Sequence, residues 1–178
     1  FSTLFDVTYN NGWVYLMGYS TTTDNIRIRR MDTTLVNSKN ILISNPDYSS
    51  LSGKSDTNKK KFGLAADALD NVYITGYSED GSTTFTNADS DETVDGDEFR
   101  ILAATTEIPW LAKLDSSFQY QWVVSPTQGD IPSFGANYKV AWDGNNSRIW
   151  WSGSYTGTSG LAMQEGSDVS SRLLLPGE

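Results

Sequence analysis

Three segments of the chain carry one strand pattern, and this repeat limits the folds that the chain can adopt. They are Asn11–Ser20 (NGWVYLMGYS), Asp70–Ser78 (DNVYITGYS) and Ser147–Tyr155 (SRIWWSGSY). In each segment large residues alternate between two faces, which is the pattern of a β-strand packed on both sides. Each run ends near a glycine, where we expect a bulge or a close backbone approach. The chain is therefore predicted to be a repeat of β-strand units.

The residues around each repeated strand predict three more strands. A tight hairpin turn precedes it, at Asn11-Gly12, Asp70-Asn71 and Asp143-Gly144. A second hairpin follows it, over Ile28–Ile43, Leu111–Val124 and Leu161–Leu175. Four antiparallel strands per unit are typical of a β-propeller blade, whereas an antiparallel sandwich does not explain the repeat. We predict an all-β fold of about three propeller-like, four-stranded antiparallel blades.

These units set the predicted domain boundaries. The first blade-like repeat spans 1–45, and a linker follows at 46–61. We expect its basic run Lys59-Lys60-Lys61 to be solvated, with pairing to the acidic insertion of the same or a neighbouring copy as the alternative. The second repeat spans 62–126 and carries an acidic insertion at 79–106. The third repeat spans 127–178.

The second unit resembles a known repeat. Its segments Gly63–Ser78 (GLAADALDNVYITGYS) and Pro109–Ser125 (PWLAKLDSSFQYQWVVS) are similar to the SBBP-type repeat of seven-bladed β-propeller surface proteins. That family joins an NVYVTGYT-like strand to an AFVAKLDPSG-like segment. This chain departs from it at Ser116-Ser117, where Pro-Ser-Gly is usual, and in its long insertion. The resemblance implies a propeller fold and an extracellular scaffold or binding role, and it implies no catalytic residues.

Three blades are fewer than the four to eight of closed propellers, so we expect open blade edges. Open edges pair readily with other strands, and we expect further copies of the chain or other protein partners to cover them. Because the sequence begins at Phe1 rather than Met, we also expect a fragment or processed part of a larger propeller or assembly.

Composition excludes or disfavours several functions. The net charge is −9, from 22 acidic and 13 basic residues, which argues against nucleic acid and anionic membranes as partners. No apolar run approaches the ~20 residues that span a bilayer, so we expect no membrane insertion. The chain has no Cys and no His, which excludes a Ser-His-Asp triad and disfavours structural zinc.

The acidic insertion is the candidate metal site, and calcium is the candidate ion. Calcium takes oxygen ligands, which the insertion offers at Asp89, Asp91, Asp95, Asp97 and Glu98. The spacing misses that of an EF-hand loop, and a solvated acidic loop is the simpler interpretation. Paired acids also cleave glycosides, but no rigid frame for them is visible. Other acids are expected to serve in turns, namely Asp67, Asp70, Asp115 and Asp143.

Two further features bear on glycans. Exposed Trp and Tyr stack on sugar rings, although we expect most of the six Trp residues to lie inside or between blades. Asn145-Asn146-Ser147 is a glycosylation sequon in a predicted turn, which makes Asn145 the candidate modification site.

Together these patterns predict a non-catalytic structural or adhesive module, secreted or displayed on a cell surface, and a subunit of a fibre or larger assembly. The alternatives are a carbohydrate-binding or carbohydrate-active propeller and a calcium-dependent ligand-binding module. No other cofactor is expected.

Overall fold

The computed structural model shows an all-β protein, which confirms the predicted fold class. It describes residues 3–21, 25–35, 38–44, 61–78, 81–87, 98–104, 107–126, 133–156, 161–165 and 168–175. Side chains are not described at 98–104, 126, 133–137, 153–156, 161–165 and 168–175. Within the described residues there are fourteen strands and no helix, hence no helix able to cross a membrane.

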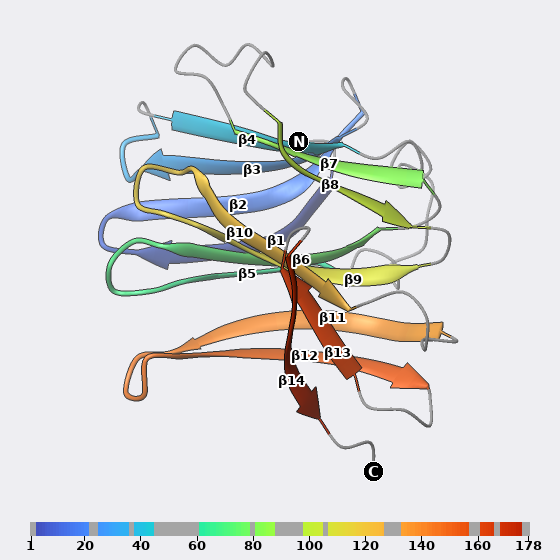
Figure 1. Ribbon diagram of the computed structural model, residues 1–178. Coiled ribbons are helices and arrows are strands. Elements are labelled where there is room, and N and C mark those ends of the chain that lie inside the picture. Colours follow the sequence, from blue (N-terminus) through green and yellow to red (C-terminus); the bar gives the residue numbers. More distant parts are fainter. Residues whose placement is uncertain are drawn as a thin grey trace.

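The strands form three antiparallel sheets (Figure 1). Sheet 1 has the order β1-β2-β3-β4-β7-β8, with β1 (Thr3–Asn10), β2 (Trp13–Ser20), β3 (Asn25–Asp32), β4 (Ser38–Ser44), β7 (Gly81–Thr86) and β8 (Glu98–Ala104). Sheet 2 has the order β14-β13-β10-β9-β6-β5, with β5 (Gly63–Ala66), β6 (Val72–Ser78), β9 (Ile108–Leu114), β10 (Tyr120–Pro126), β13 (Leu161–Glu165) and β14 (Asp168–Leu175). Sheet 3 is the hairpin of β11 (Ser133–Asp143) and β12 (Arg148–Thr156). The runs β1 to β4 and β5-β6-β9-β10 are compatible with propeller-like blades.

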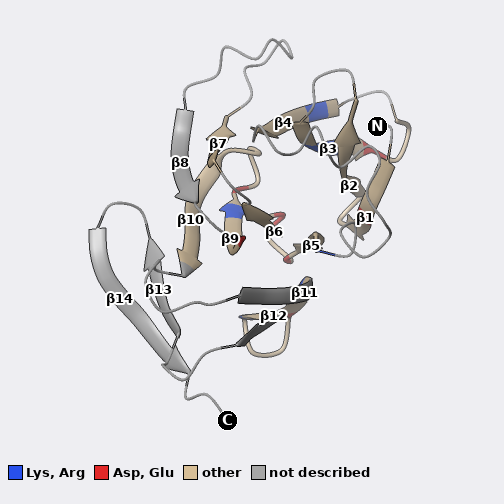
Figure 2. Ribbon diagram, turned by 90° about the vertical axis from the view of Figure 1, so that its right-hand side faces the viewer, with Lys and Arg blue, Asp and Glu red and all other residues tan. Residues whose placement is uncertain are grey.

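The sheets stack face to face, with sheet 2 in the middle. Viewed along the strands, β1 to β4 curve over one side of β5, β6 and β9, and β11 and β12 lie on the other side (Figure 2). The core between sheets 1 and 2 contains Tyr15, Met17, Val72 and Trp110, all fully buried. A second core joins sheet 2 to sheet 3, around Tyr73 and four partly buried aromatic or aliphatic residues, Trp122, Trp142, Ile149 and Trp151. Sheet 2 is thus covered on both faces, as the alternation of large residues predicted.

Equivalent residues of the repeated strand face the same way along the stack. Tyr15 of β2 packs towards sheet 2, and its counterpart Tyr73 of β6 packs towards sheet 3. On the opposite face of the strand, Val72 packs towards sheet 1, and its counterpart Ile149 of β12 packs towards sheet 2. The stack therefore has a direction: the tyrosine of one repeated strand faces the sheet that follows, and the Val72 or Ile149 position faces the sheet that precedes.

Two hairpins attach to the sheet that precedes their own unit. β7 and β8, which lie in the predicted insertion, extend sheet 1 because β7 pairs with β4. β13 and β14 extend sheet 2 in the same way, because β13 pairs with β10. The sequence alignment made Leu161–Leu175 the counterpart of Leu111–Val124, but its pairing makes it the counterpart of β7 and β8. The physical reason is that the outer edges of β4 and β10 carry unpaired backbone groups, which an added hairpin satisfies.

Gly76 is the point of closest approach in the first core. A Cβ atom added there would lie 2.5 Å from Cζ2 of Trp110 and 2.7 Å from the ring of Phe62. Both rings are fully buried and cannot move aside without opening the core. The close approach expected at the end of the repeated strand is confirmed at this glycine.

We expect Gly76→Ala to lower the free energy of unfolding by about 1–3 kcal/mol, because overpacking forces buried rings to shift. The matched control is Gly144→Ala in the β11–β12 turn, where the added Cβ would lie 3.7 Å from its nearest neighbour, Nε1 of Trp142. Urea unfolding of both variants measures the difference. Equal losses for the two variants would show that the core does not confine Gly76.

Candidate functional site at the junctions and open faces of the stack

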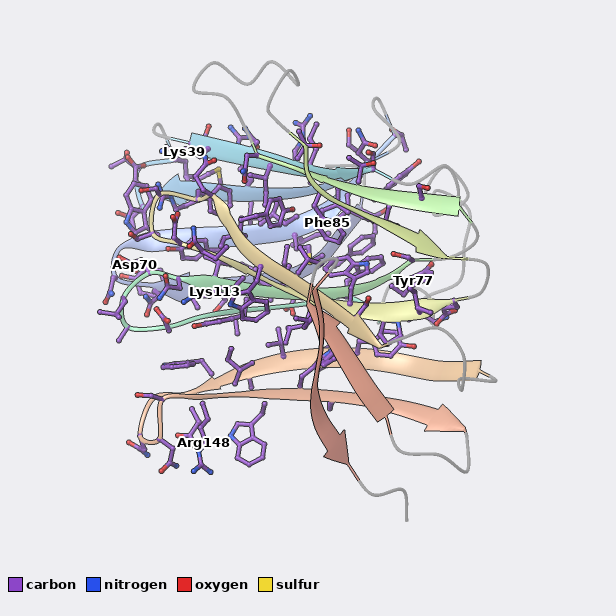
Figure 3. All side chains as sticks on the ribbon, in the orientation of Figure 1. Lys39, Asp70, Tyr77, Phe85, Lys113 and Arg148 are labelled. Carbon is purple, nitrogen blue, oxygen red and sulfur yellow. The ribbon has the colours of Figure 1, made fainter. Side chains whose placement is uncertain are left out.

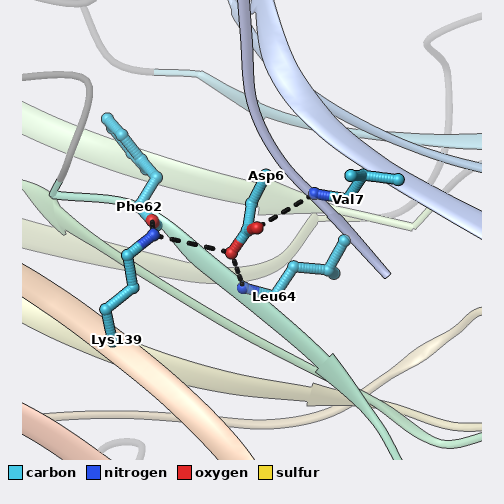
Figure 4. Close-up of polar contacts among 5 residues, drawn as sticks. All are labelled: Asp6, Val7, Phe62, Leu64 and Lys139. Carbon is cyan, nitrogen blue, oxygen red and sulfur yellow. Dashed lines mark hydrogen bonds and ion pairs between the residues drawn. The ribbon is translucent and has the colours of Figure 1, made fainter. Parts of the chain in front are cut away.

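A polar junction joins the first strands of the three sheets (Figure 4). Oδ2 of Asp6 on β1 accepts the backbone N–H of Leu64 on β5 at 3.0 Å. The Nζ atom of Lys139 on β11 donates to the backbone carbonyl of Phe62 at 2.8 Å and lies 3.6 Å from Asp6 Oδ2. β5 has β6 on one side only, so these side chains satisfy backbone groups on its open edge. The junction fixes β1, β5 and β11 side by side.

We expect Asp6→Ala to lower the free energy of unfolding by about 1–3 kcal/mol, because it leaves the N–H of buried Leu64 without an acceptor. Asp6→Asn is the matched control, since its amide oxygen can still accept that hydrogen bond. Lys139→Met should lower the free energy of unfolding by less than Asp6→Ala does, because the Lys139 side chain is half exposed. Chemical denaturation ranks the three variants, and a larger loss for Lys139→Met would show that the cation, not the edge hydrogen bond, holds the junction.

A second polar cluster lies around Tyr77, at the end of the strands opposite the β5–β6 turn. Figure 3 shows Tyr77 and Asp70, a residue of that turn, at opposite ends of the strands. Lys61 forms an ion pair with Glu107, and its Nζ atom lies 4.7 Å from the ring centroid of Tyr77. The hydroxyl of Tyr138 donates to Glu107 Oε1 at 3.3 Å. Burial, reinforced by the Glu107 carboxylate, raises the pKa of Tyr138 far above its usual value.

This cluster corrects one expectation. The basic run Lys59-Lys60-Lys61 was expected to be solvated, but Lys61 is buried. A buried ammonium group needs a charged partner, and Glu107 provides it. The other two lysines of the run lie outside the described residues.

The turn between β5 and β6 is built around a buried carboxylate. Oδ1 of Asp67 accepts the backbone N–H groups of Leu69 and Asn71, both at 2.9 Å. Oδ2 accepts Asn71 Nδ2 at 2.7 Å and the hydroxyl of Tyr73 at 3.0 Å. Burial raises the pKa of Asp67, but these hydrogen bonds outweigh burial and hold the pKa below its usual value.

The same geometry recurs between β9 and β10, which confirms the predicted turn role of these acids. Oδ1 of Asp115 accepts the N–H groups of Ser117 at 2.8 Å and Gln119 at 3.0 Å, and Oδ2 accepts Gln121 Nε2 at 2.8 Å. In both turns the residue three positions after the acid has positive φ, 62° at Asp70 and 67° at Phe118. Asp143 caps the β11–β12 turn through the N–H of Asn145 and Nδ2 of Asn146. These carboxylates are committed to the backbone.

We expect Asp67→Ala to lower the free energy of unfolding by at least about 2 kcal/mol, because buried donors lose a charged acceptor. The depressed pKa adds a pH dependence. The stability that the Asp67 carboxylate contributes is fully present above the unfolded-state pKa of about 3.9. It is lost as pH falls through the lower folded-state pKa.

Urea unfolding of the wild type and of Asp67→Ala from pH 7 to pH 3 tests this pH dependence. The stability gap between wild type and Asp67→Ala should narrow as pH falls below about 4. Asp143→Ala, in an exposed turn, is the control and should cost less. A gap that stays constant down to pH 3 would contradict the proposed role of the carboxylate.

Side chains on strands of sheet 1 also bind turns of sheet 2. Nδ2 of Asn10 donates to the Asp67 carbonyl at 2.7 Å and to Asp70 Oδ1 at 2.8 Å. The buried Arg30 guanidinium donates to the Ser116 carbonyl at 2.5 Å and lies 4.6 Å from the ring centroid of Trp13. Sequence reasoning missed these contacts, because nothing in a strand pattern pairs a strand residue with a distant turn.

The predicted calcium ligands stay untested. Asp89, Asp91, Asp95 and Asp97 lie outside the described residues, and for Glu98 only the backbone, in β8, is described. Among the residues that the structure does describe, no group of three or more acidic side chains is placed to hold a metal ion. Asn145 lies in the exposed β11–β12 turn, where a glycan could be attached.

The tryptophans lie mostly where the sequence placed them. Trp110 is fully buried in the first core, Trp13 packs against that core, and Trp122, Trp142 and Trp151 pack in the second core. Trp142 stacks on Tyr73, with ring centroids 5.8 Å apart. Trp150 is the exception, because 60% of its surface is exposed on the outer face of sheet 3.

The outer face of sheet 1 is the second exposed apolar surface. β1 presents Leu4, Val7 and Tyr9, which are 51%, 54% and 63% exposed. Val7 pairs with Leu16 and Tyr9 pairs with Val14 across β1 and β2, so these four side chains share one face. Exposed apolar side chains thus lie along β1 of sheet 1 and at Trp150 of sheet 3, at opposite ends of the stack. Farther along the same face of sheet 1, Asn40 and Leu42 on β4 are buried.

No protein-family model matches the chain, and no curated protein or solved structure gives a significant match. The resemblance to the SBBP-type repeat therefore stays a prediction, carried by the residues quoted for it. Chemically, the described acids and cations hold turns, strand edges and sheet junctions, and the exposed apolar groups gather at the ends of the stack. This arrangement is suited to contact with other macromolecules.

Proposed function

We propose that the chain is a non-catalytic structural module of an extracellular or cell-surface protein, which builds larger assemblies by stacking. The observation that carries the proposal is the exposed apolar side chains at opposite ends of a stack whose middle sheet is covered on both sides, namely Leu4, Val7 and Tyr9 on β1 and Trp150 on β12. A stack with such ends gains stability when another sheet covers them, because apolar surface leaves water.

The polar groups support the same function. Asp67 and Asp115 are saturated by turn hydrogen bonds, and Asp6 and Lys139 tie neighbouring strands together. Groups engaged in this way stiffen the body rather than turn over a substrate. The many uncharged polar residues and the resemblance to surface repeats favour a location outside the cell.

The test is particle mass over a range of concentrations, by sedimentation velocity, with electron microscopy of the same sample. We expect species larger than the 19.6 kDa chain that grow with concentration and appear as regular particles or filaments. A monomer at every concentration up to the millimolar range would contradict the proposal.

The acidic insertion calls for a separate test of the calcium alternative. Thermal unfolding in millimolar calcium and in chelator shows whether the ion stabilises the fold. For a structural module that needs no ion, we expect equal melting temperatures. A rise with calcium that is lost in Asp95→Asn would favour the calcium-dependent ligand-binding module instead.

A further inference from the structure

We propose that a second copy of this chain docks head to tail, with the outer face of sheet 3 around Trp150 covering the outer face of sheet 1 around Val14 and Leu16. The inference deepens the proposed function and rests on it. It names which surfaces meet and in which orientation.

The repeat inside the molecule shows what each open face normally meets. Val14 is the counterpart of Val72, four residues before the repeat glycine, and Val72 is covered by the tyrosine face of the sheet before it. Trp150 is the counterpart of Tyr15 and Tyr73, three residues before the glycine, and each tyrosine is covered by the sheet that follows. Among the described residues, no aromatic sheet face covers Val14, and no sheet covers Trp150. A second copy covers both.

Exposure singles out the same two faces. Among the described residues, the exposed large apolar side chains on strands are Leu4, Val7, Tyr9 and Trp150, all on these two faces. The other two, Leu35 and Leu69, lie in turns. The three on β1 lie together on one strand, and such a group marks a contact surface. Trp150 stands alone on its face, and its place in the repeat, not its exposure, makes it a contact residue.

The shape of the sheet 3 face also suits a contact. Trp150 pairs across the hairpin with the small Ala141, and Asp143 pairs with Arg148. The indole therefore stands beside a small residue and is bordered by polar groups, as at the apolar centre and polar rim of an interface. Figure 3 shows Arg148 on the outer side of β12, away from sheet 2.

Charge disfavours a symmetric contact between two sheet 1 faces. Arg29 pairs with Leu16 and Arg27 pairs with Gly18, so the outer face of sheet 1 carries two guanidinium groups among its apolar residues. Two such faces docked on each other would bring four arginines together, which costs energy. An aromatic face instead offers arginine a cation–π contact, as Trp13 already offers Arg30 inside the molecule. Two different faces that fit each other generate open chains rather than closed dimers.

The experiment uses two variants, each with one face blocked. Val7→Lys adds positive charge to the arginine-bearing face of sheet 1, and Trp150→Lys removes the aromatic centre of the sheet 3 face. Both sites are more than half exposed, so the fold should persist, which circular dichroism checks. Tyr9→Lys and Trp150→Thr are the reserve variants if either protein fails to fold. Leu69→Lys, in a turn, is the matched control.

Sedimentation velocity then compares the variants alone and mixed at equal concentration. We expect the wild type and Leu69→Lys to form chains, and each blocked variant alone to stay monomeric at the same concentration. The mixture of Val7→Lys and Trp150→Lys should form 1:1 dimers, because each variant keeps the face that the other lacks.

The remaining outcomes separate the two proposals. A monomeric wild type would overturn both this inference and the proposed function. Assembly that survives in both blocked variants would overturn the inference and leave the proposed function standing. Assembly of one blocked variant on its own would overturn the head-to-tail orientation, because a symmetric contact uses one face only. Blocked variants that are monomeric alone and stay monomeric when mixed would also overturn it, because the two intact faces then do not bind each other.

Discussion

Burial of both faces of sheet 2 is the constraint on which the rest of this structure depends. Tyr73 and Leu111 need an apolar neighbour on one side, and Val72 and Trp110 need one on the other. A sheet of this kind cannot stand alone in water, so the chain must place a further sheet on each side. The stack, its direction and its two unfinished ends follow from that requirement.

Polar contacts then fix how the stacked sheets align. Apolar burial has no direction of its own, and it would tolerate a slipped or rotated sheet. The Asp6 carboxylate and the Lys139 ammonium bind backbone groups of β5, and Asn10 binds the turn at Asp67, so each sheet has one position relative to the next. The buried pair of Lys61 and Glu107 adds a further fixed point at the other end of the strands.

The sequence could predict the local structure, but not that two hairpins attach to the sheet that precedes their own unit. Alternation of large residues predicts the strands β2, β6 and β12, although only β6 is buried on both faces. The acids at Asp67 and Asp115 predict turns, because this signal lies within a few residues. The attachment of β13 to β10 could not be read, since pairing between distant strands leaves no local pattern. The junction could not be predicted either, because Asp6 and Lys139 are distant in sequence and no local pattern pairs them.

The central claim is that sheet 2 is enclosed between sheets 1 and 3, and amide hydrogen exchange of the dilute, monomeric protein tests it most directly. Strands enclosed on both faces exchange through rarer openings than strands with one open face. The account predicts the slowest exchange in β6 and β9, and faster exchange in β1 and β12. Exchange in β6 that is as fast as in β12 would mean that sheet 2 is not enclosed, and would contradict the stacked architecture.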